Sequence, residues 1–281
     1  MKTIFAKEII DSVKALCLSA AYNLEKDATD AIKAARAKEE SPLGRDALDQ
    51  IITNISIARH ESMPLCQDTG IAVFFVELGG DCRIDGSLED AINEGVRQGY
   101  DEGYLRKSVC HPLTRKNTND NTPAIIHVTV TSGDKLKIKI APKGAGSENM
   151  SKLTMLKPAQ GVEGVKNFVI NTISIAGGNP CPPIIVGVGI GGNFEKSAIL
   201  SKKALLRPIG SVNPDNELAR LEDELLRAIN ALGIGPMGFG GTQTALAVHI
   251  ESYPCHIASL PVAVNIQCHA SRHKEAVLSQ V

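Results

Sequence analysis

The sequence predicts an α/β fold with mixed β-sheets and hairpins surrounded by helices, in a single large domain over residues 1–281. Apolar residues recur at helical spacing in several segments, and short runs rich in Val and Ile lie between those segments. No internal repeat, low-complexity tract or long linker interrupts the chain. With 281 residues and 43% hydrophobic content, the chain is long and apolar enough to bury a substantial core.

The first half of the chain predicts helices followed by a hairpin. Helical periodicity runs through residues 5–38 and 45–60, and the run SLEDAINEGVRQGYDEGYL (87–105) begins with a serine suited to cap a helix. An apolar strand, IAVFFVEL, lies between these helices. In AIIHVTVTSGDKLKIKIAPKG, two alternating segments flank a Ser-Gly-Asp turn, a pattern that predicts a β-hairpin.

The second half alternates between helices and apolar strands. Helices are expected near 160–176, over 194–206 and over 214–232, and the run PIIVGVGI between the first two reads as a buried strand. The runs TALAVHIES and LPVAVNIQ predict a second β pair.

Composition and charge exclude several classes of function. The net charge is −1, basic residues are dispersed, and aromatic residues make up only 4% of the chain, so we expect no nucleic-acid partner. No apolar run reaches the length of a membrane span. The amphipathic start, with acids among its apolar residues, differs from a signal peptide, so we expect a cytoplasmic protein.

Seven cysteines carry the first hint of chemistry. An odd number without any C-x-x-C argues against a disulfide framework and against zinc ribbons. Cys66 in PLCQDTG, Cys181 in GGNPCPP and Cys268 in NIQCHASRH each stand at a strand end or loop, flanked by Gly, Pro or polar residues. Cys255 in SYPCHIA competes for the third place, while Cys17 fits a buried small apolar side chain.

A glycine-rich run supplies the main rival hypothesis. GVGIGG (187–192) satisfies G-x-G-x-x-G between a predicted strand and a predicted helix, as in a dinucleotide-binding oxidoreductase. However, no acidic residue ends a following strand about 20 residues later. A second match, GIGPMG (233–238), shows how readily this glycine-rich chain produces the pattern.

Taken together, the motifs resemble those of the alpha-type part of class I fumarate hydratases and the related L-tartrate dehydratases. The resemblance covers nearly the whole chain. It is carried by MPLCQDTG, LRKSVCHPLTRKNTNDNTPA, KGAGSENMSKL, GVGIGGNFEKSAILSKKALLR and GIGPMGFGGTQTALAVHIESYPCHIASLPVAVNIQCHASR. It implies a hydro-lyase acting on a small dicarboxylate, with hydration of fumarate to malate as the first expectation and dehydration of L-tartrate as the alternative.

The resemblance also implies a cofactor. Cys66, Cys181 and Cys268 match the positions that bind a 4Fe-4S cluster, one iron of which has no cysteine ligand. That iron would act as a Lewis acid toward the substrate hydroxyl, and a fourth cysteine would close its open position.

Further site residues follow from the same match. Gln67 and Asp68 match substrate-contacting positions, and Asp68 would orient or relay a proton. Arg106 matches an arginine that binds a substrate carboxylate, a task for which a planar bidentate donor is suited. Gly146 matches a glycine whose backbone approaches the substrate, and His256 matches an active-site histidine. The alternatives are a loop cap for the acid, a solvated helix-end charge for the arginine, and a core residue for the histidine. Three residues lie near these motifs in sequence and receive no role: Lys143, His269 and Arg272.

The resemblance finally implies a partner. In single-chain members a second domain, with the catalytic base and further arginines, follows the part matched here. Because the sequence stops at Val281, we expect that domain to come from a separate beta-type subunit in an α2β2 complex. The chain alone should then turn over poorly or not at all.

Overall fold

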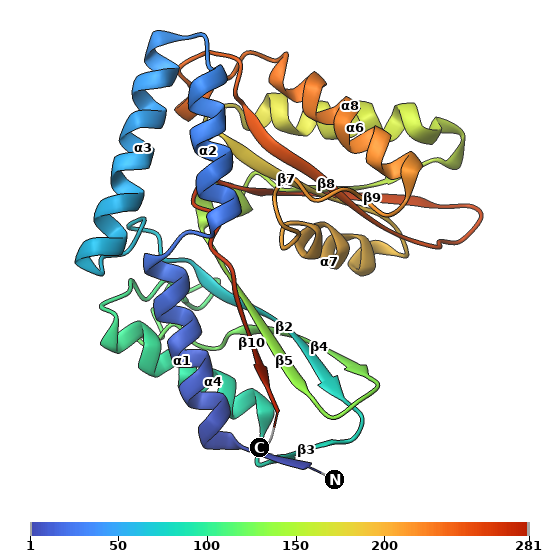
Figure 1. Ribbon diagram of the computed structural model, residues 1–281. Coiled ribbons are helices and arrows are strands. Elements are labelled where there is room, and N and C mark those ends of the chain that lie inside the picture. The colour runs from blue at the N-terminus through green and yellow to red at the C-terminus, as the bar shows by residue number, and fades with distance from the viewer. Residues whose placement is uncertain (1, 280–281) are drawn as a thin grey trace. The chain divides into compact units, whose positions relative to one another are not determined.

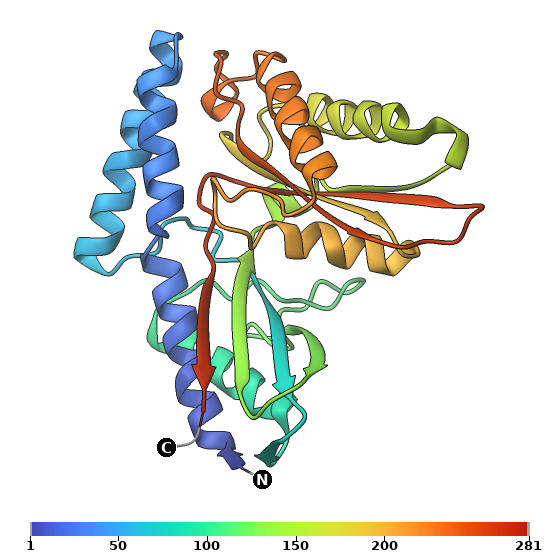
Figure 2. The same cartoon turned by 45° about the vertical axis from the view of Figure 1, so that its right-hand side comes forward.

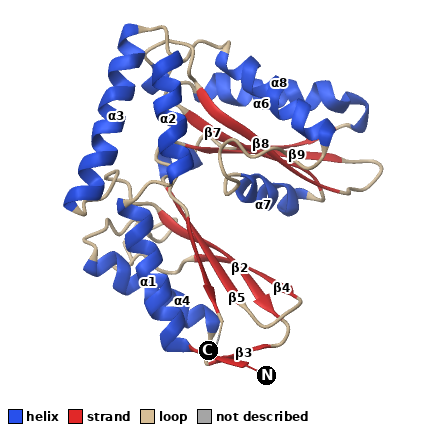
Figure 3. Ribbon diagram, in the orientation of Figure 1, coloured by secondary structure: helices blue, strands red, loops and turns tan. Residues whose placement is uncertain are grey.

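The computed structural model describes residues 2–279, which form two compact units. Unit 1 comprises Met1–Leu24, Ile55–Gly144 and Arg272–Val281, and unit 2 comprises Glu25–Asn54 and Ala145–Ser271. Each unit contains a four-stranded sheet, and unit 1 also contains a two-stranded sheet formed by residues 2–5 and 82–85. Both units contain helices as well as strands (Figure 3). The α/β class with mixed sheets is therefore confirmed.

Unit 1 is built on the sheet β10-β5-β2-β4. Two helices, α1 and α4, cover one face of this sheet and bury the apolar side of β2 and β5 beneath them. The N-cap of α4 is Ser87, as predicted, and its side chain accepts a hydrogen bond from the Asp90 amide. The elements of this unit are β1 (Lys2–Phe5), α1 (Ala6–Tyr22), β2 (Ile71–Gly79), β3 (Cys82–Asp85), α4 (Leu88–Glu102), β4 (Ile125–Thr131), β5 (Leu136–Lys143) and β10 (Lys274–Leu278).

Unit 2 contains the sheet β6-β9-β7-β8 with helices on both faces. Figures 1 and 2 agree that α6 and α8 lie on one face and α7 on the other. Its elements are α2 (Lys26–Lys38), the first part of α3 (Pro42–Glu61), α5 (Ala145–Glu148), β6 (Lys152–Leu156), η1 (Pro158–Gln160), α6 (Gly161–Ala176), β7 (Ile184–Gly191), α7 (Phe194–Ala204), α8 (Asn216–Asn230), η2 (Pro236–Gly238), β8 (Ala245–Tyr253) and β9 (Leu260–Gln267).

Both predicted hairpins are wrong in their pairing. β4 and β5 flank β2, and β8 and β9 flank β7, so an earlier strand lies between each predicted pair. The gap to be bridged is two strand spacings, about 10 Å, which a short connection can span. The turn after β4 crosses the end of β2 at Gly79, where a Cβ would lie 2.3 Å from the Gly133 carbonyl oxygen. Only glycine permits so close a crossing.

The helices otherwise follow the predicted segments. The periodicity over residues 5–38 belongs to two helices, because the chain is extended at Asn23 and Glu25, between α1 and α2. Within residues 2–279, no helix is both long and apolar enough to cross a membrane.

Candidate functional site

The loop before β2 presents three of the predicted site residues in unit 1. Cys66 and Asp68 are half-buried, and Gln67 is exposed. The Cys66 thiol lies 3.5 Å from the Gln67 side-chain oxygen. Asp68 Oδ1 accepts a hydrogen bond of 3.1 Å from the Gly70 amide, so the carboxylate also shapes the turn that carries it.

Side chains from elsewhere in unit 1 hold the backbone of this loop. Arg272 Nη2 donates to the Asp68 carbonyl oxygen at 2.9 Å. The Tyr100 hydroxyl lies 3.1 Å from the Thr69 carbonyl oxygen and 3.0 Å from that of Gly70. The carbonyl oxygens of Asp68, Thr69 and Gly70 therefore all lie within hydrogen-bond distance of buried side-chain donors, an arrangement that fixes the direction of the loop.

The same loop contacts the segment of Arg106. The Thr69 hydroxyl donates to the Arg106 carbonyl oxygen at 3.0 Å, while the Arg106 side chain itself is exposed. Unit 1 thus brings the segments of Asp68 and Arg106 together, although they are far apart in sequence. A carboxylate and a guanidinium on adjoining segments can serve proton transfer and dicarboxylate binding.

Arg272 is a buried cation beside Asp68. Its side chain is 3% exposed, and its Nε and Nη1 atoms are buried without a hydrogen-bond partner. Gly144 passes close by, since a Cβ there would lie 3.1 Å from Asp68 Oδ2. The approach of Gly146 to a substrate stays a prediction. At Gly146 a Cβ would meet only the Asn179 carbonyl oxygen, at an ordinary 3.5 Å.

In unit 2 the loops of Cys181 and Cys268 lie against each other. The Cys181 carbonyl oxygen accepts a hydrogen bond of 3.4 Å from the His269 amide, and His269 Nδ1 lies 3.0 Å from the same oxygen. Cys181 has φ of +55°, an uncommon left-handed conformation for a non-glycine residue. Gly146 adjoins this region through Asn179, two residues before Cys181. Both thiols are half-buried.

His256 and Cys255 lie elsewhere in unit 2. Both are exposed in the connection between β8 and β9, where the Cys255 thiol lies 3.2 Å from the Ser259 carbonyl oxygen. Cys268 follows the other end of β9, an eight-residue strand about 26 Å long. Unit 2 therefore does not bring His256 to Cys268, and the role of His256 stays a prediction.

The predicted ligands suit an iron–sulfur cluster by their chemistry. Three accessible thiols outside disulfides are soft donors of the kind that such clusters take. Cys66 belongs to unit 1, and Cys181 and Cys268 belong to unit 2. Within residues 2–279, no group of three or more His, Cys, Asp or Glu side chains is placed to hold a metal ion. Binding of a cluster by these three cysteines therefore stays a prediction.

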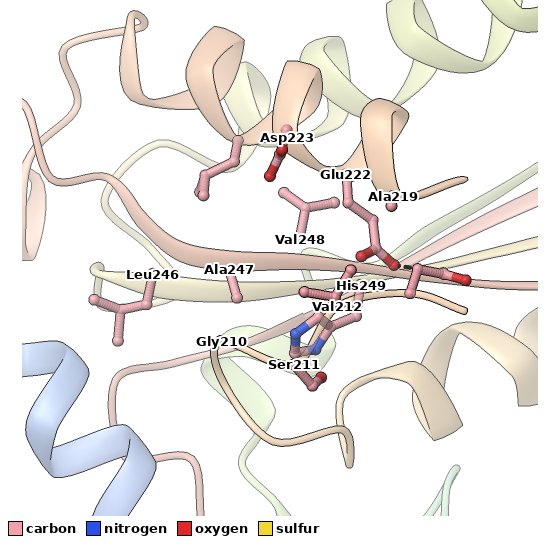
Figure 4. A pocket seen from close by; sticks show the side chains of 12 residues that line it. Gly210, Ser211, Val212, Ala219, Glu222, Asp223, Leu246, Ala247, Val248 and His249 are labelled. Carbon is pink, nitrogen blue, oxygen red and sulfur yellow. Dashed lines mark hydrogen bonds between the residues drawn. The ribbon is translucent and has the colours of Figure 1, made fainter. Parts of the chain in front are cut away.

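Two cavities of unit 2 have different surroundings. One, of about 180 Å³, is lined by His249, Ser211 and Glu222 and contains none of the predicted site residues (Figure 4). Burial lowers the pKa of His249 to about 4. Glu222 accepts a hydrogen bond of 2.6 Å from Arg207, so this carboxylate is paired within unit 2. The other, of about 680 Å³, is lined by the first part of α3, by Met237 and Phe239, and by His269 beside the cysteine loops.

The glycines of GVGIGG serve packing. A Cβ at Gly187 would lie 2.1 Å from the Ser201 carbonyl oxygen, and one at Gly189 would lie 2.0 Å from that of Ser197. These glycines let α7 lie directly on β7, a contact that any larger residue would break. The close packing explains these two glycines without a bound dinucleotide.

Sequence reasoning missed the residues that hold the loops. Thr69 and Asn121 stand inside motifs of the family match but receive no role there, and Tyr100, on the buried face of a helix, reads as core. Arg272 ends the motif CHASR, but the motif by itself gives this arginine no role. A signal was available for Asn121, because it stands in the polar run NTNDNTP directly before an apolar strand.

Comparison with known proteins agrees with these motifs. The family model described as "Fumarate hydratase (Fumerase)" matches residues 10–277, across both units. A protein of Methanocaldococcus jannaschii, provisionally named L(+)-tartrate dehydratase subunit alpha, is 48% identical over 272 residues, 94% of this chain and 95% of its own length. The L(+)-tartrate dehydratase alpha subunits of Escherichia coli K12 and Shigella boydii are each 35% identical over 250 residues, 88% of this chain and 82% of their own length. The chain therefore belongs to the fumarate hydratase (Fumerase) family of hydro-lyases, in its alpha-type form.

Proposed function

We propose that this chain is the alpha subunit of an L(+)-tartrate dehydratase. The observation that carries the proposal is 48% identity over 94% of the chain to a relative with that name, supported by enterobacterial relatives named in the same way. These names favour tartrate as the substrate, whereas the sequence motifs gave fumarate as the first expectation. Hydration of fumarate to malate is retained as the second candidate, because the matching family model is described as fumarate hydratase.

The reaction sets clear demands on the site. Loss of water from tartrate breaks one C–O bond and removes a proton from the adjacent carbon, and the enol that results tautomerises to oxaloacetate. Two carboxylates must be bound throughout, a hydroxyl must leave, and a proton must be accepted. The substrate carries its charge at both ends, so planar cationic donors are the natural partners.

The proposed roles follow from these demands. Arg106 binds one carboxylate, and Gln67 contacts the substrate from the cysteine-bearing loop. Asp68 orients or relays the proton, Gly146 gives backbone access, and His256 is the active-site histidine of the family match. The hydrogen bond between Thr69 and the Arg106 backbone supports a common site for Arg106, Gln67 and Asp68.

Cys66, Cys181 and Cys268 are the residues that would hold a 4Fe-4S cluster. When bound, such a cluster supplies a Lewis acid at its iron without a cysteine ligand. We further propose that a beta-type subunit completes the enzyme as α2β2 and brings the catalytic base, since the relatives are named as alpha subunits.

Co-expression with a beta-type subunit under anaerobic conditions tests the proposal. The assembled enzyme should contain iron and produce oxaloacetate from L-tartrate, with a higher kcat/KM than for malate or fumarate. A higher kcat/KM for the malate–fumarate pair would establish the second candidate. An iron-loaded complex that converts none of the three would refute a hydro-lyase role on these substrates.

A further inference from the structure

A buried polar network in unit 1 joins the loop of Asp68 to the segment of Arg106. Its centre is Asn121, which is 0% exposed. The Asn121 Oδ1 atom accepts hydrogen bonds from the Ser108 amide at 2.7 Å and the Val109 amide at 3.3 Å. Its Nδ2 atom donates to the Gly70 carbonyl oxygen at 3.2 Å. One side chain therefore bonds both segments.

Asn121 is well suited to this place. Its φ of +61° lies in the left-handed region, which asparagine adopts more readily than most residues. The amide offers an acceptor on one side and a donor on the other, so it can bridge amide groups and a carbonyl group at once. An apolar residue here would leave buried backbone groups unpaired, each at a substantial cost.

Tyr100 bonds the same loop from α4. Its side chain is 1% exposed, and its hydroxyl lies within hydrogen-bond distance of the carbonyl oxygens of Thr69 and Gly70. Burial raises the pKa of Tyr100, so the hydroxyl keeps its proton and acts as the donor. The hydroxyl has one proton, which it donates to one of these oxygens or shares between the two, and α4 thereby holds the loop directly after Asp68.

Thr69 closes the network on the other side. It is 3% exposed, and its hydroxyl donates to the Arg106 carbonyl oxygen at 3.0 Å. Every bond in this network lies within unit 1 and has a buried residue on at least one side, and an unpaired polar group at a buried residue is costly.

We propose that Thr69, Tyr100 and Asn121 are positioning residues that hold Asp68 and Arg106 in register for a dicarboxylate substrate. This inference rests on the proposed function, in which Arg106 binds a carboxylate and Asp68 handles the proton. Small errors in such a placement are costly, because reacting groups must meet within a few tenths of an ångström.

Two conservative substitutions test the network. Tyr100→Phe removes the hydroxyl and keeps the ring that packs in the core, and Thr69→Val removes the donor and keeps the shape. Tyr22→Phe is the matched control, since the Tyr22 hydroxyl donates to the Gly103 carbonyl oxygen at 3.0 Å in the same unit. Thr69→Ser, which restores a hydroxyl, should rescue the valine variant. If Tyr100→Phe fails to fold, the comparison of Thr69→Val with Thr69→Ser still decides the test.

Hydrogen exchange of the full chain gives the first readout. A net loss of about one hydrogen bond predicts about three- to tenfold faster exchange in both segments, 66–70 and 106–109, for either variant. Acceleration confined to the segment that lost its own bond would overturn the coupling.

Kinetics of the assembled α/β enzyme give the second readout. Because both a binding and a proton-transfer group would be displaced, KM should rise and kcat should fall together, with kcat/KM for L-tartrate about tenfold lower or more. Wild-type kcat/KM in a variant whose segments exchange faster would refute the positioning role. If the wild-type complex converts no dicarboxylate, the proposed function fails and the role toward substrate fails with it, while exchange still decides the coupling.

Discussion

Glu39 is expected to stabilise unit 2 strongly, although it carries no predicted function. It lies between α2 and α3 and is 0% exposed. Its Oε1 atom accepts hydrogen bonds from the amides of Glu40 at 2.8 Å and Ser41 at 2.9 Å. Its Oε2 atom accepts one from the Gln243 amide at 2.8 Å, and the Thr242 amide lies 3.0 Å from both oxygens. One carboxylate therefore joins the α2–α3 turn to a distant loop.

The cost of Glu39→Gln can be worked out from these contacts. Whichever way the new amide is turned, its NH2 group faces at least one amide donor, and that donor loses its acceptor. A hydrogen bond to a charged group contributes about 1.5–3 kcal/mol, and the remaining donors face a neutral oxygen. We expect a loss of about 2–4 kcal/mol in the free energy of unfolding.

The carboxylate also predicts a dependence on pH. Burial by itself raises the pKa of Glu39, but the backbone donors of Ser41, Thr242, Gln243 and Glu40 outweigh it and hold the pKa below the ordinary value of 4.5. A depressed pKa in the folded state means that the stabilisation is fully present above pH 4.5 and is lost as the pH falls through the folded pKa. The difference between wild type and Glu39→Gln should therefore shrink in acid.

Urea unfolding followed by circular dichroism at pH 7 and at acid pH measures both effects. Hydrogen exchange of the 236–244 segment assigns the loss to unit 2. Glu40→Gln is the matched control, because its side chain is exposed and should change stability by less than about 0.5 kcal/mol. The reasoning would be refuted if Glu39→Gln changed the free energy of unfolding by less than about 0.5 kcal/mol, or if the loss were the same at every pH.

Three further predictions concern the candidate site and the glycine-rich strand. Replacing any one of the three candidate ligand cysteines by Ser should abolish iron retention, measured on anaerobically purified complex, because a hydroxyl is a poor substitute for a soft thiolate. Cys17→Ser should keep the iron, since this thiol is buried in the core and burial raises its pKa to about 12. Iron loss in Cys255→Ser together with iron retention in Cys268→Ser would make Cys255 the third ligand. Arg106→Lys should mainly raise KM, whereas Asp68→Asn should lower kcat by about two orders of magnitude. Both variants should keep their iron. A wild-type kcat in Asp68→Asn would mean that the Asp68 carboxylate only caps its loop. Gly189→Ala should lower the free energy of unfolding, measured in urea, by about 1–3 kcal/mol or more, because the new Cβ would lie 2.0 Å from a backbone oxygen of α7. Gly80→Ala is the control and should lower it far less, because its Cβ would lie 3.5 Å from the nearest atom.

Local sequence signals were sufficient for most helices. The serine at position 87 begins α4, and the periodic runs near 161–176 and 216–230 form α6 and α8. These elements depend on contacts between residues three or four positions apart, which a sequence displays directly. The exception is the break between α1 and α2, because the spacing of apolar residues does not by itself indicate where a helix ends.

Strand pairing could not be predicted in the same way. The Ser-Gly-Asp turn after β4 favoured a hairpin, and the turn is present, yet β2 takes the place between the two strands. Pairing is decided by which strands bury the most apolar surface together, and that competition involves segments more than fifty residues apart. The turn only had to be long enough to cross the end of β2.

The sequence by itself determined the α/β class, the positions of the helices, the loops that carry Cys66, Cys181 and Cys268, and the family to which the chain belongs. These features depend on local spacing and on strings of residues that stand next to one another. Only the tertiary structure decided the strand order, the packing role of Gly189, and the buried bonds of Tyr100 and Asn121 to the Asp68 and Arg106 segments. Such contacts join residues distant along the chain, and the burial that makes a lone hydroxyl or amide energetically important exists only once the chain has folded.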